Sequence, residues 1–140
     1  MAEPVVHLLK LCVGVESVEQ LEAFQKARLA RGETLRHVTR NRPRRDAEVL
    51  AGGSIYWIIA GAIRVRQRIV GLERVETEVG VKCGLVFDPQ LIRTEPWARR
   101  PHQGWRYLEA KDAPPDLAEG SGADDLPPDL RAKLREIGVV

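Results

Sequence analysis

The sequence SIYWIIAGAIRVRQRI, residues 54–69, carries the strongest β-strand signal in the chain. Its first half is rich in β-branched and aromatic side chains, which favour strands, and Gly61 then marks a bend or a bulge. Beyond Gly61, apolar and polar residues alternate, as in a strand with one buried face. The alternation puts Ile63, Val65, Gln67 and Ile69 on one face and Arg64, Arg66 and Arg68 on the other. This segment predicts the centre of a β-sheet.

The preceding residues predict strands alternating with helices. Residues 5–13 form an apolar run typical of a buried strand, and Ser17 with Gln20 has the spacing of a helix capping box. We expect a helix over residues 18–31, a short strand over 35–40, and a short second helix beginning at Pro43 and ending at Gly52-Gly53. The expected apolar side of the first helix consists of Val18, Leu21, Phe24 and Leu29.

The following residues predict more strands and a terminal helix. Residues 72–77 and 81–87 read as a hairpin turning near Gly80, and Asp88-Pro89 is expected to end its second strand. Shorter strands are expected over 91–94 and 105–108, then a mobile acidic loop over about 112–126 and a helix carrying Leu130, Leu134 and Ile137. The order predicts one α+β domain over residues 1–140 with a mostly antiparallel sheet.

Composition excludes several classes of protein. The apolar stretch 55–63 is too short for a membrane span, and we expect a cytoplasmic protein. The two cysteines, Cys12 and Cys83, lie in separate apolar segments and are expected to be reduced core residues. The three histidines are isolated from one another, and the sequence contains no phosphate-binding loop and no nucleophile elbow. We therefore predict no metal and no cofactor.

Charge is unevenly distributed although the net charge is only +2. Residues 36–70 contain eight basic and two acidic residues, whereas residues 109–140 contain four basic and eight acidic ones. Arginine accounts for 17 of the 22 basic residues and suits bidentate recognition of phosphate or carboxylate. Codon bias in a GC-rich genome also explains this excess. The position of the arginines is therefore more informative than their number.

Arginines in the central strand form the first candidate site. In an extended strand, Arg64, Arg66 and Arg68 lie on one face at intervals of roughly 6.6 to 7 Å, close to the phosphate repeat of a nucleic-acid strand. The alternative is a solvated sheet face on which they pair with glutamates of a neighbouring strand. The expected glutamate partners are Glu73, Glu76 and Glu78.

The most basic window, residues 36–45, forms the second candidate site. Its arginines and the amides of the helix at Pro43 would converge on a phosphate. The anion-binding candidates are Arg36, Arg40, Arg42 and Arg44. The alternative is that Arg36 and Arg40 pair with carboxylates of the first helix.

Residues 93–107 form the third candidate site, because aromatic residues alternate there with arginines, a mixture typical of nucleic-acid sites. The candidates are Arg93, Arg99, Arg100, His102, Gln103, Trp105, Arg106 and Tyr107, and Trp97 is a further stacking candidate. The alternative is that the tryptophans close the core beneath a rigid loop.

These sites lead to three hypotheses of function. The first is an accessory domain that binds RNA or a nucleotide, with arginines on phosphates and an aromatic ring on a base. The second is a small enzyme for a phosphorylated or carboxylated metabolite, with His102 or His37 as general acid-base. The third is a protein-interaction module. The sequence does not indicate the oligomeric state.

Several longer motifs resemble a known family. They are HLLKLCVG (residues 7–14), GGSIYWII (52–59), RQRI (66–69), LIRTEP (91–96) and RRPHQGWRYL (99–108). Together they resemble the bacterial family known as domain of unknown function 1489, over nearly the whole chain. That family has no established activity, so the resemblance implies no catalytic residue. At the level of fold analogy, the Gly-Gly turn and the strands after it resemble the small pseudo-barrel of the PUA-like superfamily, many members of which bind RNA or modified bases.

Overall fold

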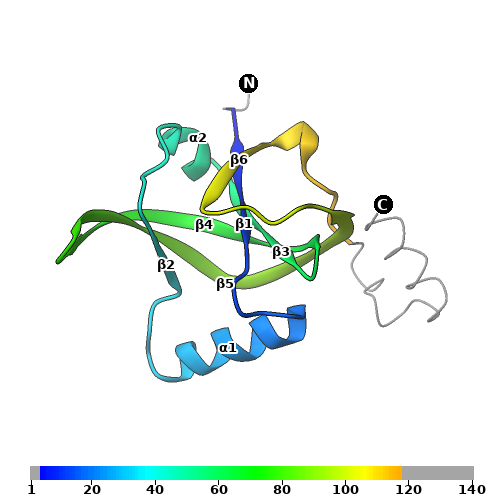
Figure 1. Cartoon of the computed structure of the whole chain (residues 1–140), viewed down its shortest axis with the longest axis horizontal. Coiled ribbons are helices and arrows are strands. Elements are labelled where there is room, and N and C mark those ends of the chain that lie inside the picture. Colours follow the sequence, from blue (N-terminus) through cyan, green and yellow to red (C-terminus); the bar gives the residue numbers. More distant parts are fainter. Residues whose placement is uncertain (1–3, 118–140) are drawn as a thin grey trace.

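A computed structural model describes residues 4–117 and contains one β-sheet and two α-helices (Figure 1). The helices are α1 (Val18–Ala30) and α2 (Asp46–Leu50), and a 3-10 turn, η1, covers Ala110–Asp112. The strands are β1 (Val6–Leu11), β2 (Arg36–Thr39), β3 (Ser54–Ile59), β4 (Ala62–Thr77), β5 (Gly80–Ala98) and β6 (Trp105–Glu109). The predicted terminal helix and most of the predicted acidic loop lie outside the described residues.

The six strands form one sheet in the order β2-β5-β4-β3-β1-β6. β1 pairs with β3 in parallel, with Lys10 beside Trp57, and the other pairings are antiparallel. The mixed α+β class and the mostly antiparallel sheet are therefore confirmed. Within residues 4–117, β2 and β6 are the two edges and do not pair with each other, so the sheet is open. The PUA-like pseudo-barrel is not supported.

Each face of the sheet carries its own apolar cluster. Ile55 and Trp57 of β3 belong to the larger cluster, which α1 and α2 cover, whereas Tyr56 and Ile58 belong to the smaller cluster. Alternate residues of a strand point to opposite faces, which explains this division. Cys12 and Cys83 are both buried in the larger cluster and are not joined by a disulfide.

A β-bulge changes the predicted face of one residue. The pairing of β3 with β4 runs from Trp57 opposite Val65 to Ile58 opposite Ile63, so β4 has one extra residue, Arg64, at this register shift. Ile63 consequently packs in the smaller cluster while Val65 packs in the larger one. The prediction that Ile63 shares a face with Val65 is wrong, because an extra residue shifts the alternation.

Strand β5 continues through Asp88 and Pro89, where the sequence predicted an end. The register shifts there, since Gln67 lies opposite Leu91 and Ile69 lies opposite Phe87. Proline is tolerated in a sheet at such irregularities because its missing N–H falls where the hydrogen-bond ladder is already interrupted. Residues 91–94, expected as a separate strand, are therefore part of β5.

Helix α1 begins as predicted, with the Ser17 hydroxyl accepting a hydrogen bond from the Gln20 amide. Its buried residues are Val18, Leu21 and Gln25. Phe24 and Leu29, which the apolar pattern assigned to the buried side, are 50% and 40% exposed. The helix thus buries a glutamine in place of an apolar side chain, for which the site below gives the reason.

Helix α2 begins at Asp46, three residues later than the proline predicted to start it. After it, Gly53 lies against two other segments: a Cβ atom there would sit 2.4 Å from the Val6 carbonyl oxygen and 2.6 Å from that of Val49. Glycine is therefore required where α2 passes into β3. Neither helix of the described residues has the length and apolarity to cross a membrane.

Candidate functional site

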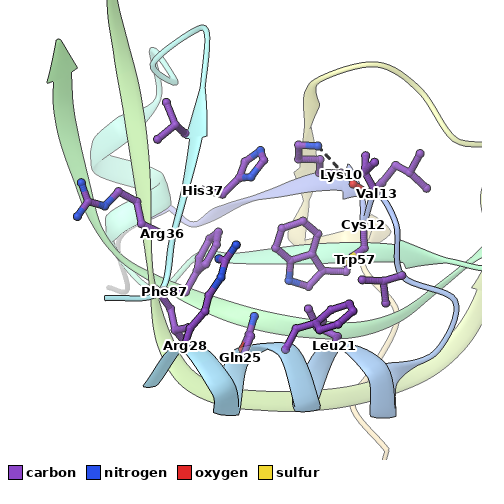
Figure 2. A pocket seen from close by; sticks show the side chains of 15 residues that line it. Lys10, Cys12, Val13, Leu21, Gln25, Arg28, Arg36, His37, Trp57 and Phe87 are labelled. Atoms are coloured by element: carbon purple, nitrogen blue, oxygen red, sulfur yellow. Dashed lines mark hydrogen bonds between the residues drawn. The ribbon is translucent and has the colours of Figure 1, made fainter. Parts of the chain in front are cut away.

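A pocket of about 390 Å³ lies between α1, β2 and the end of β1 (Figure 2). Trp57 of β3 and Phe87 of β5 contribute its aromatic wall, and α1 contributes Leu21, Gln25 and Arg28. A volume in this range is typical of small-molecule sites, which usually combine apolar walls with a few polar groups.

A network of hydrogen bonds behind the pocket holds the aromatic wall in place. The side-chain amides of Gln25 and Gln67 exchange two hydrogen bonds, at 3.0 and 2.8 Å. The Trp57 indole N–H donates to Gln67 Oε1 at 3.3 Å, and Gln67 Nε2 also donates to the Asp88 carbonyl at 2.8 Å. The Trp57 ring meets Phe87 edge-on, with centroids 5.7 Å apart. These contacts fix the indole and explain why α1 buries a glutamine.

Basic side chains line the pocket from its mouth to its interior. Arg28 is exposed, His37 is half-buried, and Lys10 is only 9% exposed (Figure 2). The lining residues include no aspartate or glutamate. Within residues 4–117, neither Lys10 nor Arg28 takes part in an ion pair, although seven other arginines do. The pocket therefore presents positive charge that no described carboxylate neutralises.

Burial and neighbouring charge set the protonation of these groups. Burial lowers the pKa of Lys10, and the pKa of His37 is lowered by burial and by the charges of Lys10 and Arg28. Cys12, also in the pocket lining, has its pKa raised to about 11 by burial, so its thiol is neutral near pH 7. His37 is thus mainly neutral near pH 7, and negative charge placed in the pocket would raise its pKa.

Apolar side chains surround the mouth of the pocket. Val13, Phe24 and Val38 line it and are 76%, 50% and 42% exposed. Exposed apolar groups next to basic groups suit a ligand with an apolar body and an anionic group. Among residues 4–117, no three His, Cys, Asp or Glu side chains gather in a way that would hold a metal ion.

The arginines of the first predicted site lie elsewhere. Arg66 is bonded to both carboxylate oxygens of Asp116, at 2.7 and 2.8 Å, instead of to a glutamate of a neighbouring strand. Arg64 donates to the carbonyls of Ile59 and Ala60 in the β3–β4 turn. Arg68 is exposed. The two bonded arginines are therefore engaged in holding the fold.

The second predicted site, residues 36–45, reaches the pocket only through β2. Arg36 is among the lining residues, but its guanidinium points away from the others, toward Glu73 at 3.2 Å (Figure 2). Arg42 pairs with Asp46 at 3.2 Å, while Arg40 and Arg44 are exposed. The Asp46 carboxylate accepts from the Ala47 amide, so the first turn of α2 already carries an anion. The alternative, that Arg36 and Arg40 pair with carboxylates of the first helix, is not found among residues 4–117, since Arg36 pairs with Glu73 of β4.

The third predicted site is partly occupied by structural contacts. Arg93 pairs with Glu19 at 3.0 Å, and a ring nitrogen of His102 lies 3.2 Å from the Leu9 carbonyl oxygen. The indole N–H of Trp105 donates to the Asn41 carbonyl at 3.2 Å. The Tyr107 hydroxyl accepts from the backbone N–H of Arg45 at 3.1 Å. Four further candidates are exposed: Arg99, Arg100, Gln103 and Arg106.

The three predicted sites do not form one surface. Trp105 and Tyr107 pack against the larger cluster and hold residues 41–45, so the second and third sites meet. Arg66 lies opposite Tyr56, whose side chain is on the other face of the sheet. No observation tests whether these residues bind anions, and that role stays a prediction.

Sequence patterns missed most of the pocket. The sequence predicts His37 only as an acid-base candidate and assigns no binding role to Lys10, Gln25 or Arg28. The signal for Lys10 was a charge inside the apolar run of residues 5–13, and the signal for the glutamine pair was a polar residue, Gln67, on the apolar face of its strand. Both are polar residues placed where a strand is buried.

Comparison with known proteins identifies a family. No curated protein and no solved structure matches the chain. A family model described as "Protein of unknown function (DUF1489)" matches residues 8–140, which is nearly the whole sequence. The chain belongs to this family.

Proposed function

We propose that the protein binds a small organic anion in the pocket formed by α1, β1 and β2. The observation that carries this proposal is the pair of basic residues, Lys10 and Arg28, that line the pocket beside Trp57 without a described carboxylate partner. A buried ammonium is costly to leave uncompensated, so an anionic ligand that enters the pocket stabilises it. The ligand class is a carboxylate, sulfonate or phosphate attached to an apolar or aromatic body.

A mononucleotide belongs to this class, and an extended RNA is supported less well. A base packs on an aromatic ring and a phosphate on a basic group, which the pocket offers at Trp57 and Arg28. Binding of a nucleic-acid backbone would need a continuous row of available arginines. Arg66, Arg42 and Arg93 are instead paired with carboxylates of the chain itself.

An enzyme for an anionic metabolite is the second candidate function. The observation that favours it is the half-buried imidazole of His37 in the same pocket, with a pKa held below its usual value. A neutral imidazole beside bound substrate suits a general base. A substrate screen with tryptophan fluorescence as the first filter, followed by product detection, separates binding from turnover.

The proposal is tested by calorimetric titration with 1-naphthalenesulfonate, an aromatic anion that does not titrate near neutral pH. Arg28→Gln is expected to weaken binding about tenfold, the equivalent of one charge-assisted hydrogen bond. Lys26→Gln is the matched control, because Lys26 lies exposed on the same helix and does not line the pocket. No binding by the wild-type protein, or equal weakening in both variants, would contradict the proposal.

A further inference from the structure

Lys10 has the position of a candidate nucleophile in the pocket, in addition to its proposed role as a positive charge for the anionic ligand. It lies on β1, next to the edge strand β6, with Trp57 of β3 on one side and Trp105 of β6 on the other. Its ammonium donates to the Leu11 carbonyl at 3.3 Å, and among residues 4–117 it has no ion pair. One hydrogen bond uses only one of three donors. The Lys10 amine is therefore part-buried, is held by one hydrogen bond, and belongs to the lining of the pocket.

Burial raises the fraction of Lys10 in its neutral, nucleophilic form above that of an exposed lysine. Burial disfavours the ammonium and lowers its pKa, which is how proteins activate lysines that form imines. The nearest competing nucleophile in the lining, Cys12, is held as an unreactive thiol because burial raises its pKa to about 11. His37 lines the same pocket (Figure 2), and the charge of Lys10 contributes to lowering its pKa.

We propose that Lys10 forms a reversible imine with an organic anion that bears an aldehyde or ketone group. This inference rests on the proposed function, since Arg28 at the mouth of the pocket would hold the anionic group of the same ligand. The neutral amine adds to the carbonyl carbon, and a proton moves from the amine nitrogen to the carbonyl oxygen to give a neutral carbinolamine. A second proton converts the hydroxyl into water, which leaves as the nitrogen lone pair forms the C=N bond.

The product suits the pocket electrostatically. The net step consumes the neutral amine, the carbonyl compound and one proton and yields an iminium ion and water, with no oxidant or reductant. The iminium nitrogen carries the positive charge that the ammonium carried, so the attraction between nitrogen and bound anion is kept. His37 supplies and recovers the protons of the two steps.

The test is reductive trapping on the full-length wild-type protein, with glyoxylate as the probe and cyanoborohydride as the reductant. Peptide mapping then compares Lys10 with the exposed Lys26 and Lys111 in the same sample. Lys10 is expected to be labelled several-fold faster than both, because each unit by which burial lowers its pKa raises its neutral fraction about tenfold, while the lower basicity of the amine offsets part of this gain. Labelling spread evenly over the lysines, or slowest at Lys10, would overturn the inference.

Two further arms separate recognition of the anion from simple reactivity. Arg28→Gln should slow labelling of Lys10 and leave that of Lys26 unchanged, and acetaldehyde, which lacks the anionic group, should show a smaller preference for Lys10. Excess 1-naphthalenesulfonate should protect Lys10. Wild-type protein that binds the sulfonate but shows no preferential labelling would disprove the imine alone, whereas failure of both would remove the proposed function as well.

Discussion

Two glutamines, Gln25 of α1 and Gln67 of β4, join the helix to the sheet beneath the pocket. Each amide both donates to and accepts from the other, and Gln67 also serves Trp57 and the Asp88 carbonyl. A buried polar group is tolerated when its hydrogen bonds are satisfied and is costly when they are not. No buried side-chain N or O atom among the described residues lacks a hydrogen-bond partner.

Gln67→Met is expected to lower the free energy of unfolding by roughly 2–4 kcal/mol, because it leaves the Trp57 N–H, the Gln25 amide and the Asp88 carbonyl without a partner. Urea denaturation measures the effect. Gln90→Met is the control, since Gln90 is exposed on β5 and its replacement should change stability by about 0.5 kcal/mol or less. If Gln67→Met costs no more than the control, the network does not stabilise the fold.

His37 gives anion binding a defined pH dependence. Burial on β2, together with Lys10 of β1 and Arg28 of α1, holds the pKa of His37 below 6.5, while the neighbouring Arg36 pairs with Glu73 and the Cys12 thiol is neutral. A bound anion favours the imidazolium and therefore raises this pKa. The affinity should rise as the pH falls from the bound-state pKa toward the free-state pKa, and it should be constant above that window.

Calorimetric titration of 1-naphthalenesulfonate over about pH 5 to 8 tests this dependence. His37→Gln is expected to flatten the profile. His102→Gln is the matched control, because His102 lies outside the pocket lining, and its profile should match that of the wild type. The same steep profile in His37→Gln would exclude His37 as the titrating group.

Strand β6 holds residues 41–45, the segment that precedes α2, through two hydrogen bonds. The Trp105 and Tyr107 rings meet edge-on with centroids 5.0 Å apart and bond to the backbone of Asn41 and Arg45. The Arg45 guanidinium lies 5.3 Å from the Tyr107 ring centroid and pairs with Glu48 and Glu109. Trp105 and Tyr107, which the sequence predicted to stack on a base, thus hold residues 41–45 in place.

Tyr107→Phe removes the hydroxyl that accepts from the Arg45 N–H and should cost about 1 kcal/mol of stability. The loosened segment should also be cut faster by trypsin at Arg40 and Arg44, and cutting at Arg74 in the distant β4–β5 hairpin gives the internal control. Unchanged cleavage at both arginines would mean that the hydroxyl does not hold this segment.

Local patterns predicted most elements, and the exceptions have physical causes. Three local signals predicted their segments correctly, because each acts over only a few residues. They are the Ser17 cap, the strand pattern of β3 and the turn near Gly80. The bulge at Arg64 and the continuation of β5 through Pro89 depend on the register with a neighbouring strand, which no local pattern contains. Prediction therefore failed where strands pair irregularly.

Over the whole molecule, the pocket depends on chain segments that are far apart in sequence. Four of its lining residues come from four different elements: β1 carries Lys10, α1 carries Arg28, β2 carries His37 and β3 carries Trp57. The parallel pairing of β1 with β3 places Lys10 beside Trp57. The arginine-rich windows of the sequence predicted anion-binding sites on other surfaces. In the folded chain, several of those arginines pair with carboxylates. Sequence alone located the basic residues of the chain but did not show that Lys10 and Arg28 form no ion pair within residues 4–117.

The most direct measurement of the central claim is a set of amide and indole ¹H–¹⁵N NMR spectra recorded as 1-naphthalenesulfonate is added. Binding in the pocket predicts shifts concentrated in residues 10–13, 24–28 and 35–38 and at the Trp57 indole N–H. The Trp105 indole and residues 64–68 should stay unchanged. Shifts that gather at residues 64–68 or 99–107 and leave Trp57 unmoved would contradict the account and restore the arginine surfaces as the binding site.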